Sequence, residues 1–169
     1  MIYNASFDNT TKVLSTVIVA AILVIVASFW GNIAQSVGAG MPLSAFFGKI
    51  LLTLLLLSII IFVFLYSINY YRIENNTLYI HRRLNTVTVP FAEIKTVCAV
   101  ADSDMGLVFR TFGVGGLFGY LGKFSSSKLG SLTYYATQNK NRVFIELHNS
   151  KKFLITPDDM GIVGQLSVQ

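Results

Sequence analysis

The residues best suited to contact a charged surface lie between Met105 and Ile145. This stretch contains five basic residues and no acidic residue, and aromatic side chains alternate with the basic ones. Cations beside amphipathic aromatic rings are the combination that binds at the headgroup level of an anionic membrane. We therefore take as candidate lipid- or partner-binding residues Arg110, Phe112, Leu117, Phe118, Tyr120, Lys123 and Lys128.

Glycines dominate the same stretch, because seven of the thirteen glycines lie between Gly106 and Gly130. Glycine permits positive φ and close backbone approach, so residues 106–130 are predicted to form a shaped loop and not a strand. Two interpretations remain open. In one, the aromatic rings pack into the core and the glycines make tight turns. In the other, the apolar candidates reach the headgroup–acyl boundary while the three candidate cations meet anionic lipid.

Other side chains give little support for catalysis or cofactor binding. His81 and His148 have no neighbouring nucleophile at informative spacing, and two carboxylates in Asp102-Ser-Asp104 fall short of a calcium site. The single cysteine, Cys98, lies in an apolar stretch and is expected to be a small buried side chain. The sequence therefore predicts no enzyme, no metal and no cofactor. A net charge of +5 without a recognition motif also predicts no nucleic-acid binding.

Composition places the chain with membrane proteins, since 53% of its residues are hydrophobic and 12% are charged. Two uncharged runs, Val13–Trp30 and Ile50–Tyr66, are each long enough to cross most of a hydrocarbon core about 30 Å thick. We expect an N-terminal tail at 1–12 and a transmembrane helical hairpin at 13–66, with spans at about 13–31 and 44–67. The connection Gly31–Pro42 is uncharged and turn-like.

The basic residues near the two spans indicate an orientation. Four of them flank the ends that lead to the termini, whereas Lys49 alone lies on the side of the connection. The positive-inside rule then predicts that both termini and everything after residue 67 are cytoplasmic. Trp30 at one end of the spans, and Tyr66, Tyr70 and Tyr71 at the other, fit an interfacial aromatic belt.

The remaining residues, 68–169, alternate between apolar and polar at period two in several short segments. Asparagine-rich turns separate these segments, a pattern typical of a sandwich or a small barrel. Thr156 followed by Pro157 and two aspartates predicts the start of a short C-terminal helix. The fold class expected is therefore a membrane helical hairpin followed by a mainly-β domain.

Three segments carry a more specific resemblance: 110–124, with its glycine–aromatic run, 129–137 and 153–159. They resemble bacterial PH (pleckstrin-homology-like) domain proteins that are anchored by membrane hairpins. The resemblance covers about 68–169 and implies a seven-stranded PH-like barrel or sandwich closed by a short C-terminal helix. It also implies a bacterial inner membrane as the location, and it supplies no catalytic residues.

These observations lead to one expected function and one alternative. The expected function is a non-enzymatic interaction module at the cytoplasmic membrane surface, which contacts lipid headgroups or a membrane-protein partner. Small residues at Ala20, Ala21 and Ala27 also permit a homo-oligomer within the membrane. The alternative is a small-ligand-sensing domain with an internal pocket lined by Phe109, Tyr120 and Tyr134.

Overall fold

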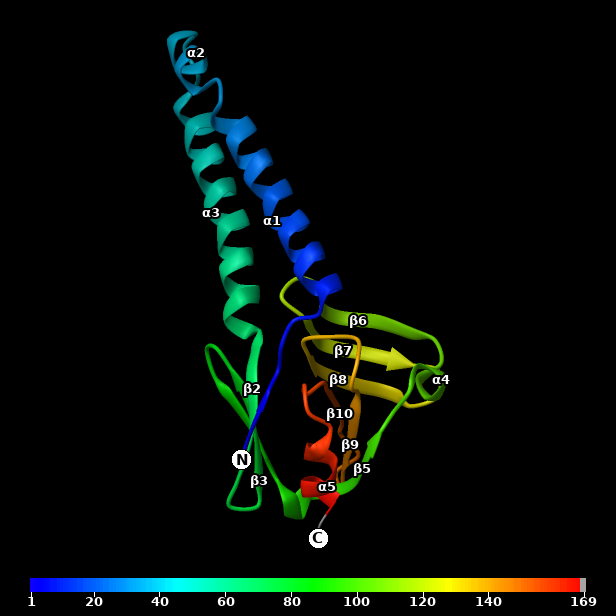
Figure 1. Ribbon diagram of the computed structural model, residues 1–169. Coiled ribbons are helices and arrows are strands. Elements are labelled where there is room, and N and C mark those ends of the chain that lie inside the picture. The colour runs from blue at the N-terminus through cyan, green and yellow to red at the C-terminus, as the bar shows by residue number, and fades with distance from the viewer. Residues whose placement is uncertain (168–169) are drawn as a thin grey trace.

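A computed structural model describes residues 1–167, which form a two-sheet body with a pair of long helices projecting from it (Figure 1). Helix α1 (Asn9–Trp30) and helix α3 (Leu43–Tyr66) run antiparallel and are joined by the short α2 (Ile33–Gly38). The most apolar 18-residue windows of the segments that contain α1 and α3 have mean hydropathies of 2.6 and 2.7, and only 6% of each window is buried. By length and composition, both helices are able to cross a membrane.

The body contains two sheets that do not close into a barrel. One has four strands in the order β1-β2-β3-β4, and the other has six in the order β5-β9-β10-β8-β7-β6. All neighbours are antiparallel except β8 and β10, which are parallel. The strands are β1 (Ile2–Asn4), β2 (Ile68–Glu74), β3 (Thr77–Arg82), β4 (Thr86–Pro90), β5 (Ile94–Ala99), β6 (Val108–Gly115), β7 (Tyr120–Ser126), β8 (Gly130–Ala136), β9 (Val143–Leu147) and β10 (Lys152–Ile155).

The strand count corrects the expectation of seven strands in a barrel or sandwich. Nine of the described strands, β2 to β10, lie after residue 67. The alternation at period two identified β3, β4, β5, β8, β9 and β10. It missed β2, β6 and β7, because tyrosines in β2 resemble an interfacial belt and glycines interrupt the alternation in β6 and β7.

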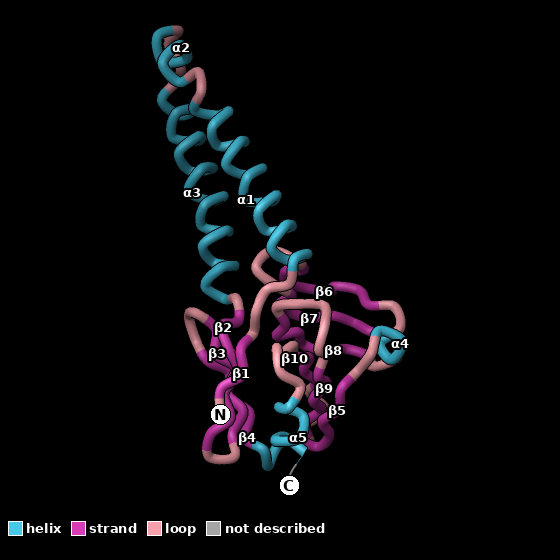
Figure 2. Tube along the Cα trace, viewed as in Figure 1, coloured by secondary structure: helices cyan, strands magenta, loops and turns pink. Residues whose placement is uncertain are grey.

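The main core lies between the two sheets, as the separate groups of strands in Figure 2 indicate. Tyr71 of β2 is fully buried there. Its hydroxyl donates to the carbonyl oxygen of Tyr135 at 2.7 Å and accepts from the backbone N–H of Thr156 at 3.1 Å. The expectation that Tyr71 belongs to an aromatic belt is therefore wrong, because this side chain joins the two sheets.

The N-terminal tail is part of the body. Residues Ile2–Asn4 form β1, which pairs antiparallel with β2, and Tyr3 and Ala5 are buried in the main core. The Ser6 hydroxyl donates to the Asp158 carboxylate at 2.6 Å. Residues 1–12 are thus not a free tail, and helix α1 already begins at Asn9. The body is attached to the helix pair at both α1 and α3.

The C-terminal helix begins later than Thr156. Helix α5 spans Gly161–Ser167 and lies between the lower ends of the two sheets, where Ile162 and Leu166 are buried (Figure 2). The Thr156 hydroxyl accepts instead from the backbone N–H of Thr137, so it is not free to cap a helix. At the N-terminus of α5, the Asp159 carboxylate accepts a hydrogen bond of 2.8 Å from the backbone N–H of Gly161.

The segment 106–130, expected to be a loop, forms the hairpin of β6 and β7 and the first residue of β8. Gly113 and Gly122 face each other across this hairpin at φ values of +112° and +120°. A Cβ at either position would lie within 2.4 Å of a carbonyl oxygen on the opposite strand. The glycines therefore allow the two strands to approach closely, and do not interrupt them.

Candidate functional site

Strand β6 forms the edge of the six-stranded sheet that lies nearest the helix pair (Figure 1). Every residue from Leu107 to Gly113 is exposed, including the aromatic rings of Phe109 and Phe112, which are 62% and 76% exposed. An edge strand with large exposed apolar side chains is a liability in water. Such a strand is expected where a membrane or a partner protein covers its apolar side chains.

A β-bulge at Thr111 decides which side chains of β6 share a face. Phe112 lies opposite Lys123 of β7, whereas Arg110 lies opposite the buried Phe124. Successive residues of β7 point to opposite faces, so Phe112 and Lys123 lie on the face toward α3. Arg110 lies on the other face. The structure thus separates these two predicted cations across the sheet, with Arg110 on the edge strand and Lys123 on the strand beside it, and both side chains are exposed.

The tip of the hairpin contacts both long helices. The Ser15 hydroxyl of α1 donates to the carbonyl oxygen of Gly116 at 3.1 Å and accepts from the backbone N–H of Phe118 at 2.9 Å. The Phe118 ring meets the ring of Phe64 in α3 edge-on, with centroids 5.3 Å apart. Leu117 is 8% exposed. The structure therefore packs Phe118 locally against the helices and buries the Leu117 side chain beside it.

Lys128 lies at the other end of the hairpin, beside α4 (Asp102–Met105). Its ammonium group donates to the carbonyl oxygen of Ser103 at 2.7 Å. The seven predicted residues are therefore distributed along the hairpin. Phe112 and Lys123 share one face, Arg110 and Tyr120 share the other, Leu117 and Phe118 form the tip, and Lys128 is remote.

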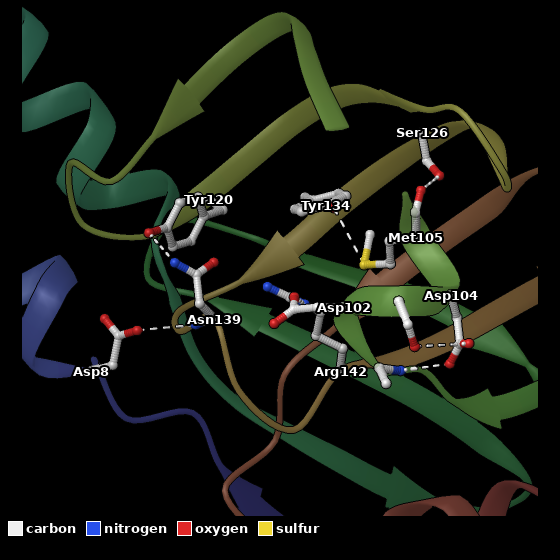
Figure 3. Close-up of polar contacts among 11 residues, drawn as sticks. Asp8, Asp102, Asp104, Met105, Tyr120, Ser126, Tyr134, Asn139 and Arg142 are labelled. Atoms are coloured by element: carbon white, nitrogen blue, oxygen red, sulfur yellow. Dashed lines mark hydrogen bonds and ion pairs between the residues drawn. The ribbon is translucent and has the colours of Figure 1, made fainter. Parts of the chain in front are cut away.

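A cavity of about 280 Å³ lies under α4, on the face that carries Arg110. Tyr120 and Tyr134 line it, as expected for the alternative function, but Phe109 does not. Figure 3 shows Tyr134 directed at Met105, to whose sulfur its hydroxyl donates at 3.9 Å. Burial raises the pKa of Tyr134 to about 12, so this hydroxyl is neutral at physiological pH.

The polar groups around this cavity already have partners. The Asp102 carboxylate pairs with the Arg142 guanidinium, and the Asn139 amide donates to the Tyr120 hydroxyl at 2.7 Å (Figure 3). The Asn139 backbone N–H donates to Asp8, the N-cap of α1, at 3.0 Å. The cavity wall is therefore connected to the start of α1, and it offers few free polar groups to a ligand.

Sequence reasoning used Arg82 and Arg83 only for orientation and gave them no role in a site. Arg83 covers the ring of Phe64, with its guanidinium carbon 4.4 Å from the centroid, and its Nε donates to the Ser67 hydroxyl at 3.2 Å. Arg82 lies over the rings of Tyr66 and Tyr135. The available signal was that these two adjacent arginines follow the second apolar run within about 20 residues. Cys98, expected to be buried, is exposed on β5.

One comparison with known proteins gives a match. The family described as bacterial PH domain matches residues 69–167, which is more than half of the chain. No curated protein and no solved structure matches the chain significantly. The match begins where α3 ends and includes both sheets from β2 onward, and with them the β6–β7 hairpin and α5. The chain therefore belongs to the bacterial PH domain family.

Proposed function

We propose that the protein is a membrane-anchored, non-enzymatic interaction module whose β6–β7 hairpin contacts the headgroups of anionic lipids at the cytoplasmic membrane surface. The observation that carries this proposal is the composition of the edge strand nearest the helix pair. That strand exposes Phe109 and Phe112, with Arg110 on one face and Lys123 opposite Phe112 on the other. Apolar rings flanked by cations match the chemistry of the headgroup–acyl boundary.

The attachment of the body supports this placement. Helix α3 ends at Tyr66 and β2 begins at Ile68, so a single residue separates them. The backbone N–H of Leu84 donates to the carbonyl oxygen of Leu65 at 2.9 Å, which ties the β3–β4 turn to the last turn of α3. With α1 bound to the hairpin tip as well, the body has little freedom to turn β6 away from the bilayer. Lipid contacts would then fix its orientation, since the helices already supply recruitment.

The first and last elements of the chain and its basic residues indicate on which side of the membrane the body lies. Strand β1 and helix α5, the first and last described elements, both belong to the body (Figure 1). Lys12, Arg72, Arg82 and Arg83 lie at this end and Lys49 at the other, which favours the cytoplasm for the body. Exposed Cys98, the single cysteine, is a native reporter. A membrane-impermeant maleimide should label it in inverted membrane vesicles and not in intact cells, and labelling in intact cells would overturn this orientation.

The contact with lipid is tested on the full chain reconstituted in vesicles. In a Cys98→Ser background, an environment-sensitive dye at Phe109→Cys reports whether β6 lies in the headgroup region. We expect a blue shift when phosphatidylglycerol is added to phosphatidylcholine. Removing two cations by Arg110→Ala with Lys123→Ala should reduce the equilibrium constant for this contact about 30-fold, at about 1 kcal/mol per charge.

The matched control removes two exposed lysines from other parts of the body, Lys95 and Lys151, by substitution with Ala. An equal loss in this control would mean that net charge, and not the hairpin, governs the shift, and would overturn the proposal. A dye that responds only in native membranes, and never to phosphatidylglycerol in vesicles, would also overturn it. That result would favour a membrane-protein partner or a second copy of the chain at the same edge.

The cavity under α4 is the basis for the alternative, a small-ligand sensor. Its volume of about 280 Å³ lies just below the range of about 300–1,000 Å³ that is common for ligand sites. Its charged groups, Asp102 and Arg142, are paired with each other. The exposed edge of β6 has no such internal partners for its rings, and for this reason we propose the lipid contact and not the sensor.

A further inference from the structure

We infer that a second lipid contact exists beside the first, in which one acyl chain of an anionic phospholipid enters a groove between α3 and the β6–β8 sheet. This inference rests on the proposed function, because the groove is reached from the membrane only if the helices span it. The groove shares Phe112 and Lys123 with the exposed edge of β6, and it adds a wall formed by α3 and a second cation, Arg82. The groove holds one lipid molecule, whereas the edge of β6 contacts the headgroups of many lipid molecules.

The groove has a volume of about 410 Å³ and a mostly apolar lining. Phe62, Val63 and Tyr66, from the last turns of α3, form one wall. Val114 and Leu121, from the face of the hairpin toward α3, form part of the other. Such a volume is within the range of ligand sites, and the apolar lining fits a hydrocarbon chain better than a polar metabolite.

Two glycines contribute bare backbone to the wall of the groove. Gly113 and Gly122, the facing pair of the hairpin, are among its lining residues. Neither position tolerates a Cβ, because the backbone of the opposite strand is too close. The glycines that permit the close pairing of β6 and β7 therefore leave this part of the groove wall without side chains.

The charge in the groove is positive. Arg82 and Lys123 are lining residues, and within the described part of the chain no aspartate or glutamate lines the groove. The Nε atom of Arg82 is buried and has no hydrogen-bond partner among residues 1–167. A buried guanidinium N–H that lacks a partner costs free energy, and an ionised acceptor such as a phosphate oxygen satisfies it about twice as strongly as a neutral one. The neighbouring rings of Tyr66 and Tyr135 hold the guanidinium in place from two sides.

The apolar surface of α3 continues directly into the groove. Phe62 lines the groove and is 58% exposed, and Ile59 and Ile61 of the preceding turn are exposed as well. If α3 crosses the bilayer, a lipid in the adjacent leaflet already touches this surface. Entry then needs only a sideways movement of one acyl chain while the headgroup stays at the level of Arg82. This continuity and the charge together favour an anionic phospholipid as the occupant.

The experiment uses the full chain in nanodiscs with a phosphatidylglycerol that carries a photoreactive diazirine in its acyl chain, and adducts are located by mass spectrometry. We expect adducts on the groove-lining peptides, in excess over those formed by the matched phosphatidylcholine probe. Val114→Trp fills the groove and should abolish them. Val108→Trp, a substitution on the opposite face of β6, is the control and should leave them unchanged. Arg82→Gln should weaken the preference for phosphatidylglycerol about fivefold, the effect of about 1 kcal/mol.

Two results would overturn the inference. One is labelling confined to the outward surfaces of α1 and α3 in the unaltered chain. The other is groove labelling that persists in Val114→Trp, with thermal unfolding confirming that this variant is folded. The dye at Phe109→Cys separates this failure from that of the proposed function. Val114→Trp should leave its response to phosphatidylglycerol intact, so a lost groove signal with an intact dye response contradicts only the groove.

Discussion

Ser15 in the second turn of α1 and Gly116 at the tip of the β6–β7 hairpin are joined by a hydrogen bond of 3.1 Å, although they lie 101 residues apart in sequence. The same hydroxyl accepts from the backbone N–H of Phe118 at 2.9 Å. One buried side chain therefore satisfies both a carbonyl and an amide of the tip. This contact couples the orientation of the body to that of the first apolar helix.

Substitution of Ser15 should release the hairpin tip. Ser15→Ala leaves the Gly116 carbonyl and the Phe118 amide without their partner, at a cost of about 1–3 kcal/mol. We expect the Phe118 amide to exchange with deuterium about 5- to 150-fold faster in nanodiscs. Thr16→Ala is the matched control, because the Thr16 hydroxyl bonds only to the Lys12 carbonyl of its own helix. Unchanged exchange in Ser15→Ala would contradict the coupling.

The facing glycines of the hairpin should tolerate no side chain. Gly113→Ala places a Cβ 2.1 Å from the carbonyl oxygen of Leu121 at a backbone φ of +112°. The strained φ alone costs about 1–3 kcal/mol, and the clash is with backbone that cannot move aside. A large fall in thermal stability is expected. Gly164→Ala in α5, where nothing lies within 4 Å, should instead stabilise by about 0.5–1 kcal/mol. Equal effects at the two sites would refute this account of the hairpin.

Tyr71 should contribute to stability through its hydroxyl group. Tyr71→Phe keeps the ring and removes the donor to the Tyr135 carbonyl, in a partly buried hydrogen bond, and the acceptor for the Thr156 amide, in a buried one. Denaturant unfolding should reveal a loss of about 1–3 kcal/mol. Tyr79→Phe on the neighbouring strand is the control, since the Tyr79 hydroxyl has no hydrogen bond within residues 1–167. If both variants lose the same stability, the junction between the sheets does not depend on this hydroxyl.

The start of α1 should weaken in acid. Partial burial raises the pKa of the Asp8 carboxyl, but hydrogen bonds from Thr11 and Asn139 outweigh this effect and hold its pKa below the usual value of about 3.9. The unfolded chain therefore binds more protons, so the stabilisation is complete above about pH 4 and is lost as pH falls through the lowered pKa. Unfolding measured across this window should be less pH-dependent in Asp8→Asn, which keeps a helix cap without the charge. An identical pH dependence would be incompatible with this role.

Much of the architecture follows from local pattern. The two uncharged runs predict α1 and α3 to within a few residues, because a membrane-spanning helix needs only length and apolar character. Strands such as β9 and β10 are visible because one face of each packs on the core. The family resemblance, carried by the glycine–aromatic run, is confirmed by the match over residues 69–167.

The features that escaped prediction depend on strand pairing, either with a partner distant in sequence or in a register that the local pattern does not reveal. The strand Ile2–Asn4 exists only because β2 pairs with it some 70 residues later. β6 has no buried face along most of its length, so no alternation marks it, and the bulge at Thr111 shifts its register. Arg110 and Lys123 were predicted as cations of one lipid-binding segment, but the register of the hairpin places them on opposite faces.

The central claim is that the helix pair spans the bilayer and holds β6 at its surface. Immersion depth measured by spin labels on the full chain in lipid vesicles tests it most directly, with Cys98→Ser as background. A label at Leu55→Cys in α3 should lie deep in the hydrocarbon, one at Phe112→Cys at the headgroup level, and one at His148→Cys in water. A Leu55 label that is accessible to aqueous relaxation agents, or a Phe112 label as exposed to them as that at His148, would contradict the account.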